Sequence, residues 1–100
     1  MKKVYLKDHR ACRVTFTLPR AAVKKAKSVH VVGDFNDWES EATPLKRQKD
    51  GSFAATIDLQ VGREYRFRYL IDNNRWENDW AADRYEPSGY ASEENSIVVV

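Results

Sequence analysis

Three tryptophans, Trp38, Trp76 and Trp80, lie in polar, turn-like segments and not in the runs where apolar and polar residues alternate. A large aromatic side chain outside the core needs a reason, because burying it is favourable. Two reasons are open. The indoles close the ends of the fold, or their flat faces form a platform for the apolar C–H face of a sugar ring. In the second case, neighbouring arginine, lysine or asparagine side chains would hydrogen-bond the ring hydroxyls.

Residue patterns typical of enzymes are missing from the chain. The sequence has no G-x-S-x-G, no G-x-x-x-x-G-K-[ST] and no H-E-x-x-H. His9 and His30 lie far apart, and the single cysteine, Cys12, lies on an alternating apolar face that predicts a core position. The carboxylates are scattered, whereas a glycosidase needs two held across a cleft. We therefore expect no enzymatic activity, no catalytic residue, no metal site and no cofactor.

Charge is segregated along the chain, although its net value is only +2. Residues 1–33 carry nine lysines and arginines against one aspartate, a net charge of +8, whereas residues 34–100 carry a net charge of −6. A basic segment of this kind attracts phosphate or an acidic partner. If strands from the two parts interleave in a sandwich, however, the two signs offset each other. Nucleic acid is therefore not expected as a partner.

The chain has 100 residues, 42% of them hydrophobic, which is enough for one modest core. We expect residues 1–100 to form a single domain that begins with a basic N-terminal arm, residues 1–9. The longest aliphatic run, Ile97–Val100, is far shorter than the roughly 18 residues of a membrane helix. Polar residues follow the first lysines where a secretory signal would be apolar. The expectation is a cytoplasmic protein with no membrane partner.

The elements that must position the aromatic residues are short strands. Cys12, Val14, Phe16 and Leu18 alternate with polar residues, which predicts a half-buried strand. Turn residues such as Asp50-Gly51 separate the further strands expected over residues 28–32, 45–49, 53–59, 64–71 and 96–100. Residues 20–27 are expected to form a connection of at most two helical turns, and residues 77–95 a polar loop. The last strand is apolar after its serine and is expected inside a sheet.

About seven short strands with turns every 8 to 12 residues predict an all-β fold. The fold class expected is an immunoglobulin-like antiparallel β-sandwich, and an open barrel of the OB type is the main alternative. No internal repeat and no linker-like segment is visible in the sequence.

The order of these motifs resembles a family 48 carbohydrate-binding module. The resemblance rests on G-D-F-N-D-W at residues 33–38, D-G-S-F at 50–53, G-R-E-Y-R-F-R-Y at 62–69 and the turn at 72–76. G-x-F-N-x-W is fairly specific when it precedes the aromatic strand and a second tryptophan in this order. The resemblance covers about residues 12–100 and implies the early-set form of the sandwich. Such domains occur at the N-terminus of isoamylases and glycogen-branching enzymes and in the beta subunit of AMP-activated protein kinase.

This resemblance implies non-catalytic binding of α-1,4-linked glucan, such as glycogen, starch or maltodextrin. In the glycogen-binding members, a tryptophan of the F-N-x-W loop and another just after the aromatic strand form the sugar platform, and Trp38 and Trp76 match these positions. The basic residue of that strand corresponds to Arg68, and the asparagine before the last strand to Asn95. Trp80 stands where the family commonly has proline, so it either adds a third stacking surface or fills a gap.

Other members of this family use the domain as a structural appendage or a protein-docking module, and sugar binding does not follow from the fold alone. The alternative hypothesis is an interaction or regulatory module that engages a glycogen-metabolising enzyme without binding sugar itself. Only glucan binding requires retention on insoluble starch or glycogen in the absence of a partner, so a pull-down separates the two hypotheses.

Overall fold

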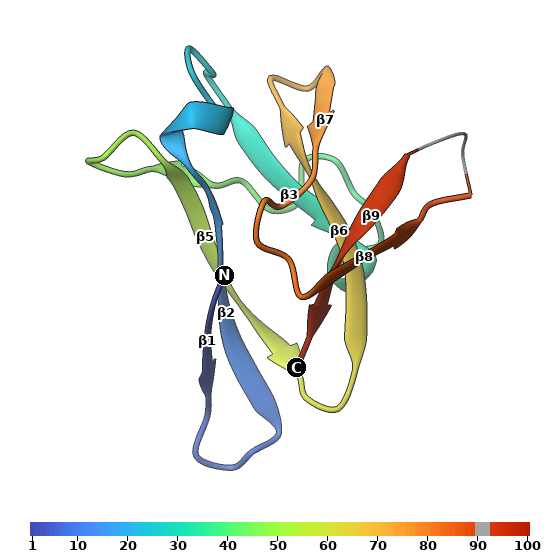
Figure 1. The fold of residues 1–100 in the computed structure, drawn as a ribbon. Helices are drawn as coiled ribbons and strands as arrows, with labels where there is room; N and C mark the ends of the chain where they lie inside the picture. Colours follow the sequence, from blue (N-terminus) through green and yellow to red (C-terminus); the bar gives the residue numbers. More distant parts are fainter. Residues whose placement is uncertain (90–92) are drawn as a thin grey trace.

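A computed structural model describes residues 1–89 and 93–100, which fold into two antiparallel sheets packed face to face (Figure 1). The strands are β1 (Lys2–Tyr5), β2 (Ala11–Leu18), β3 (Val29–Gly33), β4 (Lys46–Arg47), β5 (Phe53–Gln60), β6 (Glu64–Ile71), β7 (Arg75–Glu77), β8 (Arg84–Pro87) and β9 (Glu94–Val99). Helical structure in these ranges is limited to the 3₁₀ turns η1 (Arg20–Ala22) and η2 (Asp34–Asn36), and no helix there could cross a membrane.

The first sheet has the strand order β1-β2-β5-β4, and the second has the order β3-β6-β9-β8, with β7 also pairing with β6. This arrangement is the immunoglobulin-like β-sandwich that the sequence predicts, with nine strands in the described residues in place of about seven. β9 lies between β6 and β8, as its apolar sequence indicates.

The core lies between the sheets and consists of side chains from alternate positions of the facing strands. Those of the central strands β2 and β6 are Cys12, Val14, Phe16, Leu18, Tyr65, Phe67, Tyr69 and Ile71. The rings of Phe16 and Phe67 meet edge to face with their centroids 5.0 Å apart. Cys12 is fully buried in this core, where the alternation predicted it.

Two segments for which no strand was predicted are strands. Residues 2–5, part of the expected basic N-terminal arm, form β1 and pair with β2, and Lys3 Nζ lies 2.6 Å from an Asp83 carboxylate oxygen. Within the expected polar loop of residues 77–95, β8 forms and pairs with β9, which begins at Glu94. Residues 90–92 of that range lie outside the described residues. Tertiary pairing therefore creates two strands that have no apolar alternation of their own.

β6 is the centre of the second sheet. It pairs with β3 along one edge, and with β9 and β7 in succession along the other. Because its odd-numbered residues from 65 to 71 point into the core, its even-numbered residues point to the outer face of the sheet. The outer face can therefore bring together side chains from β6 and from the three strands that pair with it.

Candidate functional site

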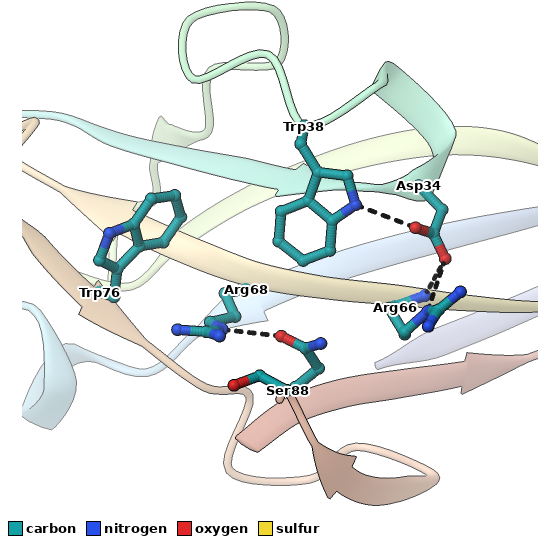
Figure 2. A pocket seen from close by; sticks show the side chains of 7 residues that line it. Asp34, Trp38, Arg66, Arg68, Trp76 and Ser88 are labelled. Carbon is teal, nitrogen blue, oxygen red and sulfur yellow. Dashed lines mark hydrogen bonds and ion pairs between the residues drawn. The ribbon is translucent and has the colours of Figure 1, made fainter. Parts of the chain in front are cut away.

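The outer face of the second sheet carries a pocket of about 480 Å³ beside β6 (Figure 2). Trp38, Trp76, Arg68 and Asn95 line it, so four of the five residues predicted from the sequence meet at one place. The other lining residues are Asp34, Arg66 and Ser88. Trp80 is also outside the core, with 56% of its surface exposed, but the described residues that line the pocket do not include it.

Strand register explains why residues so distant in sequence meet. Arg68 is an outward-facing residue of β6. β7 pairs with β6 so that Trp76 lies opposite Leu70, the next outward residue of β6. The register of β9 brings Asn95 beside Arg68, and Arg68 Nε donates a 2.8 Å hydrogen bond to Asn95 Oδ1. Three strands therefore contribute neighbouring side chains to one face.

The loop that presents Trp38 begins where β3 meets β6 at close range. A Cβ atom added to Gly33 would lie 2.4 Å from the carbonyl oxygen of Arg66, so only glycine fits there. Asn36 then fixes the loop, because its Oδ1 accepts the Gly33 N–H and its Nδ2 donates to a β3 carbonyl oxygen, both at 3.0 Å. Asp37 and Trp38 follow with left-handed backbone φ angles of 56° and 58°. The glycine and asparagine of the G-x-F-N-x-W motif thus fix the direction in which the backbone leaves β3 toward Trp38.

The ring of Trp38 is held by Asp34. Trp38 Nε1 donates a 2.9 Å hydrogen bond to Asp34 Oδ1, and Asp34 Oδ2 accepts the Arg66 backbone N–H at 2.8 Å (Figure 2). Burial alone raises the pKa of the Asp34 carboxyl. The hydrogen bonds from the Arg66 backbone, the Trp38 indole and the Arg66 side chain, together with the Arg66 charge, outweigh burial and hold this pKa below its usual value. The carboxylate is therefore charged at neutral pH and available to orient the indole.

Arg68 forms the polar floor of the pocket. Its side chain is only 13% exposed, and its Nη1 lies 3.2 Å from a Glu93 carboxylate oxygen. Its guanidinium carbon lies 5.9 Å from the centre of the Trp76 ring, a cation–π contact, and 47% of the surface of Trp76 is exposed. In the view of Figure 2, the indoles of Trp76 and Trp38 stand on either side of this guanidinium. Two aromatic faces and a fixed set of hydrogen-bond donors therefore share the pocket.

Sequence reasoning did not identify Asp34, Arg66 or Ser88 as pocket residues. The signal for Arg66 was present, because it is the outward residue of β6 before Arg68. Asp34 belongs to the quoted motif, but its role depends on the register between β3 and β6, which the motif does not give. Ser88 follows β8, a strand with no pattern in the sequence, and we find no signal that would have identified it.

The chemistry of this pocket suits a neutral ligand rich in hydroxyl groups. Flat apolar ring faces are flanked by a guanidinium and an amide, and the Asp34 carboxylate is already engaged by Trp38 and Arg66. Within residues 1–89 and 93–100, no group of three or more histidine, cysteine, aspartate or glutamate side chains is placed to hold a metal ion. His30 has a buried Nδ1 without a hydrogen-bond partner in the same ranges.

Comparison with known proteins gives one family and several relatives. Residues 22–86 match the family described as carbohydrate-binding module 48 (isoamylase N-terminal domain). The 1,4-alpha-glucan branching enzyme GlgB of Photobacterium profundum is 37% identical over 70 residues, which cover 69% of this chain and 9% of the enzyme. The enzyme of the same name from Aquifex aeolicus is 35% identical over 57 residues, covering 54% of this chain and 9% of the enzyme. The chain thus spans less than a tenth of these relatives.

Proposed function

The chain belongs to the carbohydrate-binding module 48 family, and from this premise we propose that it binds α-1,4-linked glucan, such as glycogen, starch or maltodextrin, without converting it. The observation that carries the proposal is the convergence of two exposed indoles, Trp38 and Trp76, on one pocket whose polar floor is Arg68 and Asn95. The names of the branching enzymes to which the chain is similar agree with a glucan as the ligand.

Each side chain has a separate task in this proposal. The faces of Trp38 and Trp76 stack on glucose rings, since the polar edge of Trp38 is already bonded to Asp34. Arg68 uses Nε for Asn95 and Nη1 for Glu93, and a guanidinium has five N–H donors, so others are left for sugar hydroxyls. Two platforms and a few hydrogen bonds supply roughly 4 to 7 kcal/mol, which corresponds to a Kd on the order of 10 µM to 1 mM.

Retention on insoluble starch or glycogen tests the proposal directly. We expect Trp38→Ala and Trp76→Ala to abolish retention while cooperative unfolding is preserved, because both indoles lie outside the core. Trp80→Ala is the matched control, because this indole is exposed without lining the pocket. Loss of retention in the control would show that the predicted third stacking surface at Trp80 exists. Failure of the wild-type chain to bind would favour the alternative, a protein-interaction module associated with glycogen-metabolising enzymes.

The proposal also assigns no catalytic step to this chain. A glycosidase uses two carboxyl groups across the scissile bond, whereas the carboxylate among the described lining residues is Asp34, which is bonded to Trp38 and Arg66. We expect the purified chain to release no reducing sugar from glycogen or maltodextrin, and chelators to leave binding unchanged. Turnover that disappears on mutation of a specific aspartate or glutamate would contradict this assignment.

A further inference from the structure

We propose that one end of the sandwich docks an acidic segment of a partner protein. This end is distinct from the pocket lined by Trp38 and Trp76, which we call the sugar pocket after its proposed ligand. Two stretches of chain form this surface: the connection from residue 19 to residue 28 and the β4–β5 hairpin, which lie side by side at the end marked by the coiled blue ribbon of η1 (Figure 1). We call this surface the basic end. Besides Arg47, which hydrogen-bonds across the two stretches, it has six exposed cations: Arg20, Lys24, Lys25, Lys27, Lys46 and Lys49.

Several cations elsewhere on the two sheets have carboxylate partners. Arg13 pairs with Asp58 on the first sheet. On the second sheet, Arg66 and Arg84 alternate with Asp34, Glu86 and Glu64 in one network. None of the six cations of the basic end forms an ion pair with a carboxylate in residues 1–89 and 93–100. Ion pairs between neighbouring strands therefore offset part of the segregated charge on the sheet faces, whereas the six cations of the basic end have no such pairs among the described residues.

The basic end is held as one fixed surface. Its first segment is anchored in the core by three buried residues, Ala22, Val23 and Ala26. Arg47 of β4 reaches across and donates a hydrogen bond to the Ala26 carbonyl oxygen. Arg20 lies against Gly51, where φ is +87° and an added Cβ would be 2.9 Å from the Arg20 side chain. The backbone beneath the cations is thus ordered before a partner arrives, which lowers the entropic cost of binding.

Two carboxylates lie within or beside the basic end, and both are occupied by local hydrogen bonds. Asp50 Oδ1 accepts the Ser52 hydroxyl and backbone N–H at 2.6 and 2.9 Å. Asp72 Oδ1 accepts the backbone N–H groups of Ser28 and Lys27. These hydrogen bonds lower the pKa of each carboxyl group. The basic end therefore has these six cations but only two carboxylates, both already hydrogen-bonded, and a surplus of positive charge faces solvent.

The types of side chain exposed at the basic end indicate which kind of partner it can bind. Its exposed side chains include no large apolar or aromatic residue, since the exposed ones of the described chain are Val4, Tyr5, Trp38, Trp76, Trp80, Tyr85 and Val99. Nucleic-acid bases would find nothing to stack on, and a membrane would receive no apolar anchor. Five of the six cations are lysines, which attract carboxylates as compact point charges without requiring one fixed bidentate geometry. Carboxylates of an acidic polypeptide fit this surface best.

The basic end borders the sugar pocket without sharing its lining. Arg75 Nη2 donates a 3.3 Å hydrogen bond to the Ala22 carbonyl oxygen, and the next residue, Trp76, lines the pocket. None of the six cations lines the pocket, so both surfaces can be occupied at once. If the proposed glucan binding holds, the docked partner would lie next to a bound glucan.

Binding of fluorescent poly-L-glutamate, measured by anisotropy at low and moderate salt, tests the proposal. The variant Lys24→Glu/Lys46→Glu/Lys49→Glu should lose at least about tenfold in affinity. The matched control Lys2→Glu/Lys7→Glu/Arg10→Glu changes the net charge equally at exposed cations of β1 and the β1–β2 turn, the opposite end of the first sheet (Figure 1). It should lose less than about twofold. Wild-type binding should weaken as salt rises.

Three outcomes would overturn the assignment: no wild-type binding at low salt, equal loss in both triple variants, or tighter binding of poly(dT) or phosphatidylserine vesicles than of polyglutamate. Thermal unfolding shows that each variant is folded, and single variants, Lys24→Glu against Lys2→Glu, replace any triple variant that is not. Starch retention is measured on the same proteins and should be unchanged in both. A failure of the glucan proposal is thereby distinguished from a failure of this one.

Discussion

Trp38 has one polar atom in its side chain, and the fold already uses it. The indole N–H is donated to Asp34, and Arg66 holds that carboxylate from the other side through its backbone N–H. The ring therefore cannot turn its nitrogen toward a ligand without breaking this contact, and the ring face is the part left for the stacking that we propose. In the proposed glucan binding, Asp34 is therefore a positioning residue that acts through Trp38.

Removing this carboxylate should weaken glucan binding without unfolding the chain. In Asp34→Ala the indole loses its acceptor, and we expect a fall in maltoheptaose affinity of roughly five- to tenfold, equivalent to about 1 kcal/mol for one hydrogen bond. Indole emission measures the affinity, and the Nε1–H resonance of Trp38 should shift without sugar. Asp58→Ala is the control, because Asp58 pairs with Arg13 on the other sheet. An unchanged resonance and affinity in Asp34→Ala would contradict the positioning role.

The same contact predicts a defined response to acid. The pKa of Asp34 is lowered in the folded protein, so the contact is complete above the unfolded-state pKa of about 3.9 and is lost as pH falls through the folded-state value. Sugar affinity and the Trp38 Nε1–H resonance should therefore be constant between about pH 8 and pH 5 and change only below about pH 4. Asp34→Ala should lack this transition. A midpoint near neutrality would assign the change to another group.

At the scale of elements, a buried carboxylate joins the loop after β7 to the second sheet. Tyr69 of β6 donates a 2.7 Å hydrogen bond from its hydroxyl to Asp79 Oδ2, and the Asp79 N–H donates to Ser96 Oγ of β9 at 2.9 Å. Burial and the Asp79 charge raise the pKa of Tyr69 well above its usual value, so its hydroxyl keeps the proton that it donates. Asp79 thus fixes the chain that follows Trp76.

Tyr69→Phe should destabilise the fold by about 1 to 3 kcal/mol, because it leaves a buried carboxylate oxygen without its donor. Tyr65→Phe is the matched control on the same face of β6. Its hydroxyl donates to the backbone carbonyl oxygen of Gln60, so its loss should cost only about 0.5 to 1.5 kcal/mol. Urea denaturation measures both. Equal costs for the two variants would show that the Asp79 carboxylate is not the cause.

Strands could be predicted from the sequence where one of their faces is buried, because apolar and polar residues then alternate along the strand. β2, β5 and β6 carry such patterns, whereas β1 and β8 are mostly exposed and gain their structure from pairing with β2 and β9. The residues of the pocket were likewise predictable only in part. Trp38, Trp76, Arg68 and Asn95 could be predicted through the resemblance to the family's motifs. The role of Asp34 could not, because it depends on which β6 residue lies beside η2.

At the scale of the whole molecule, the N-terminal segment and the pocket lined by Trp38 and Trp76 lie on different sheets. Deleting residues 1–9 removes β1, exposes the edge of β2 and breaks the Lys3–Asp83 ion pair. We expect a lower melting temperature, by about 4 to 8 °C for each kcal/mol lost. The maltoheptaose affinity of the folded protein should stay nearly unchanged. A truncated chain that is folded at the assay temperature but binds sugar weakly would show that β1 supports the pocket.

The salt dependence of affinity should distinguish ligand binding at the two proposed surfaces. Glucan is neutral and releases no counterions, so its affinity should change little between low and moderate salt. Polyglutamate binding at the basic end should fall steeply over the same range. Parallel titrations of one preparation measure both. Glucan affinity that falls as steeply as polyglutamate affinity would mean that charge attraction, and not stacking, holds the sugar.

The central position of β6 has a thermodynamic consequence. The pocket exists only when β3, β7 and β9 are all docked on β6 in register, so the unfolded chain and any form in which one of these strands is detached lack it. A ligand that recognises only the complete sheet shifts the equilibrium toward it by mass action, by about 2.7 kcal/mol at a free concentration of 100 Kd. Glucan should therefore slow amide hydrogen exchange in all four of these strands together. If the proposed glucan binding holds, the polysaccharide would act as a component of the folded domain, because its concentration would set the fraction of molecules in which the second sheet is complete.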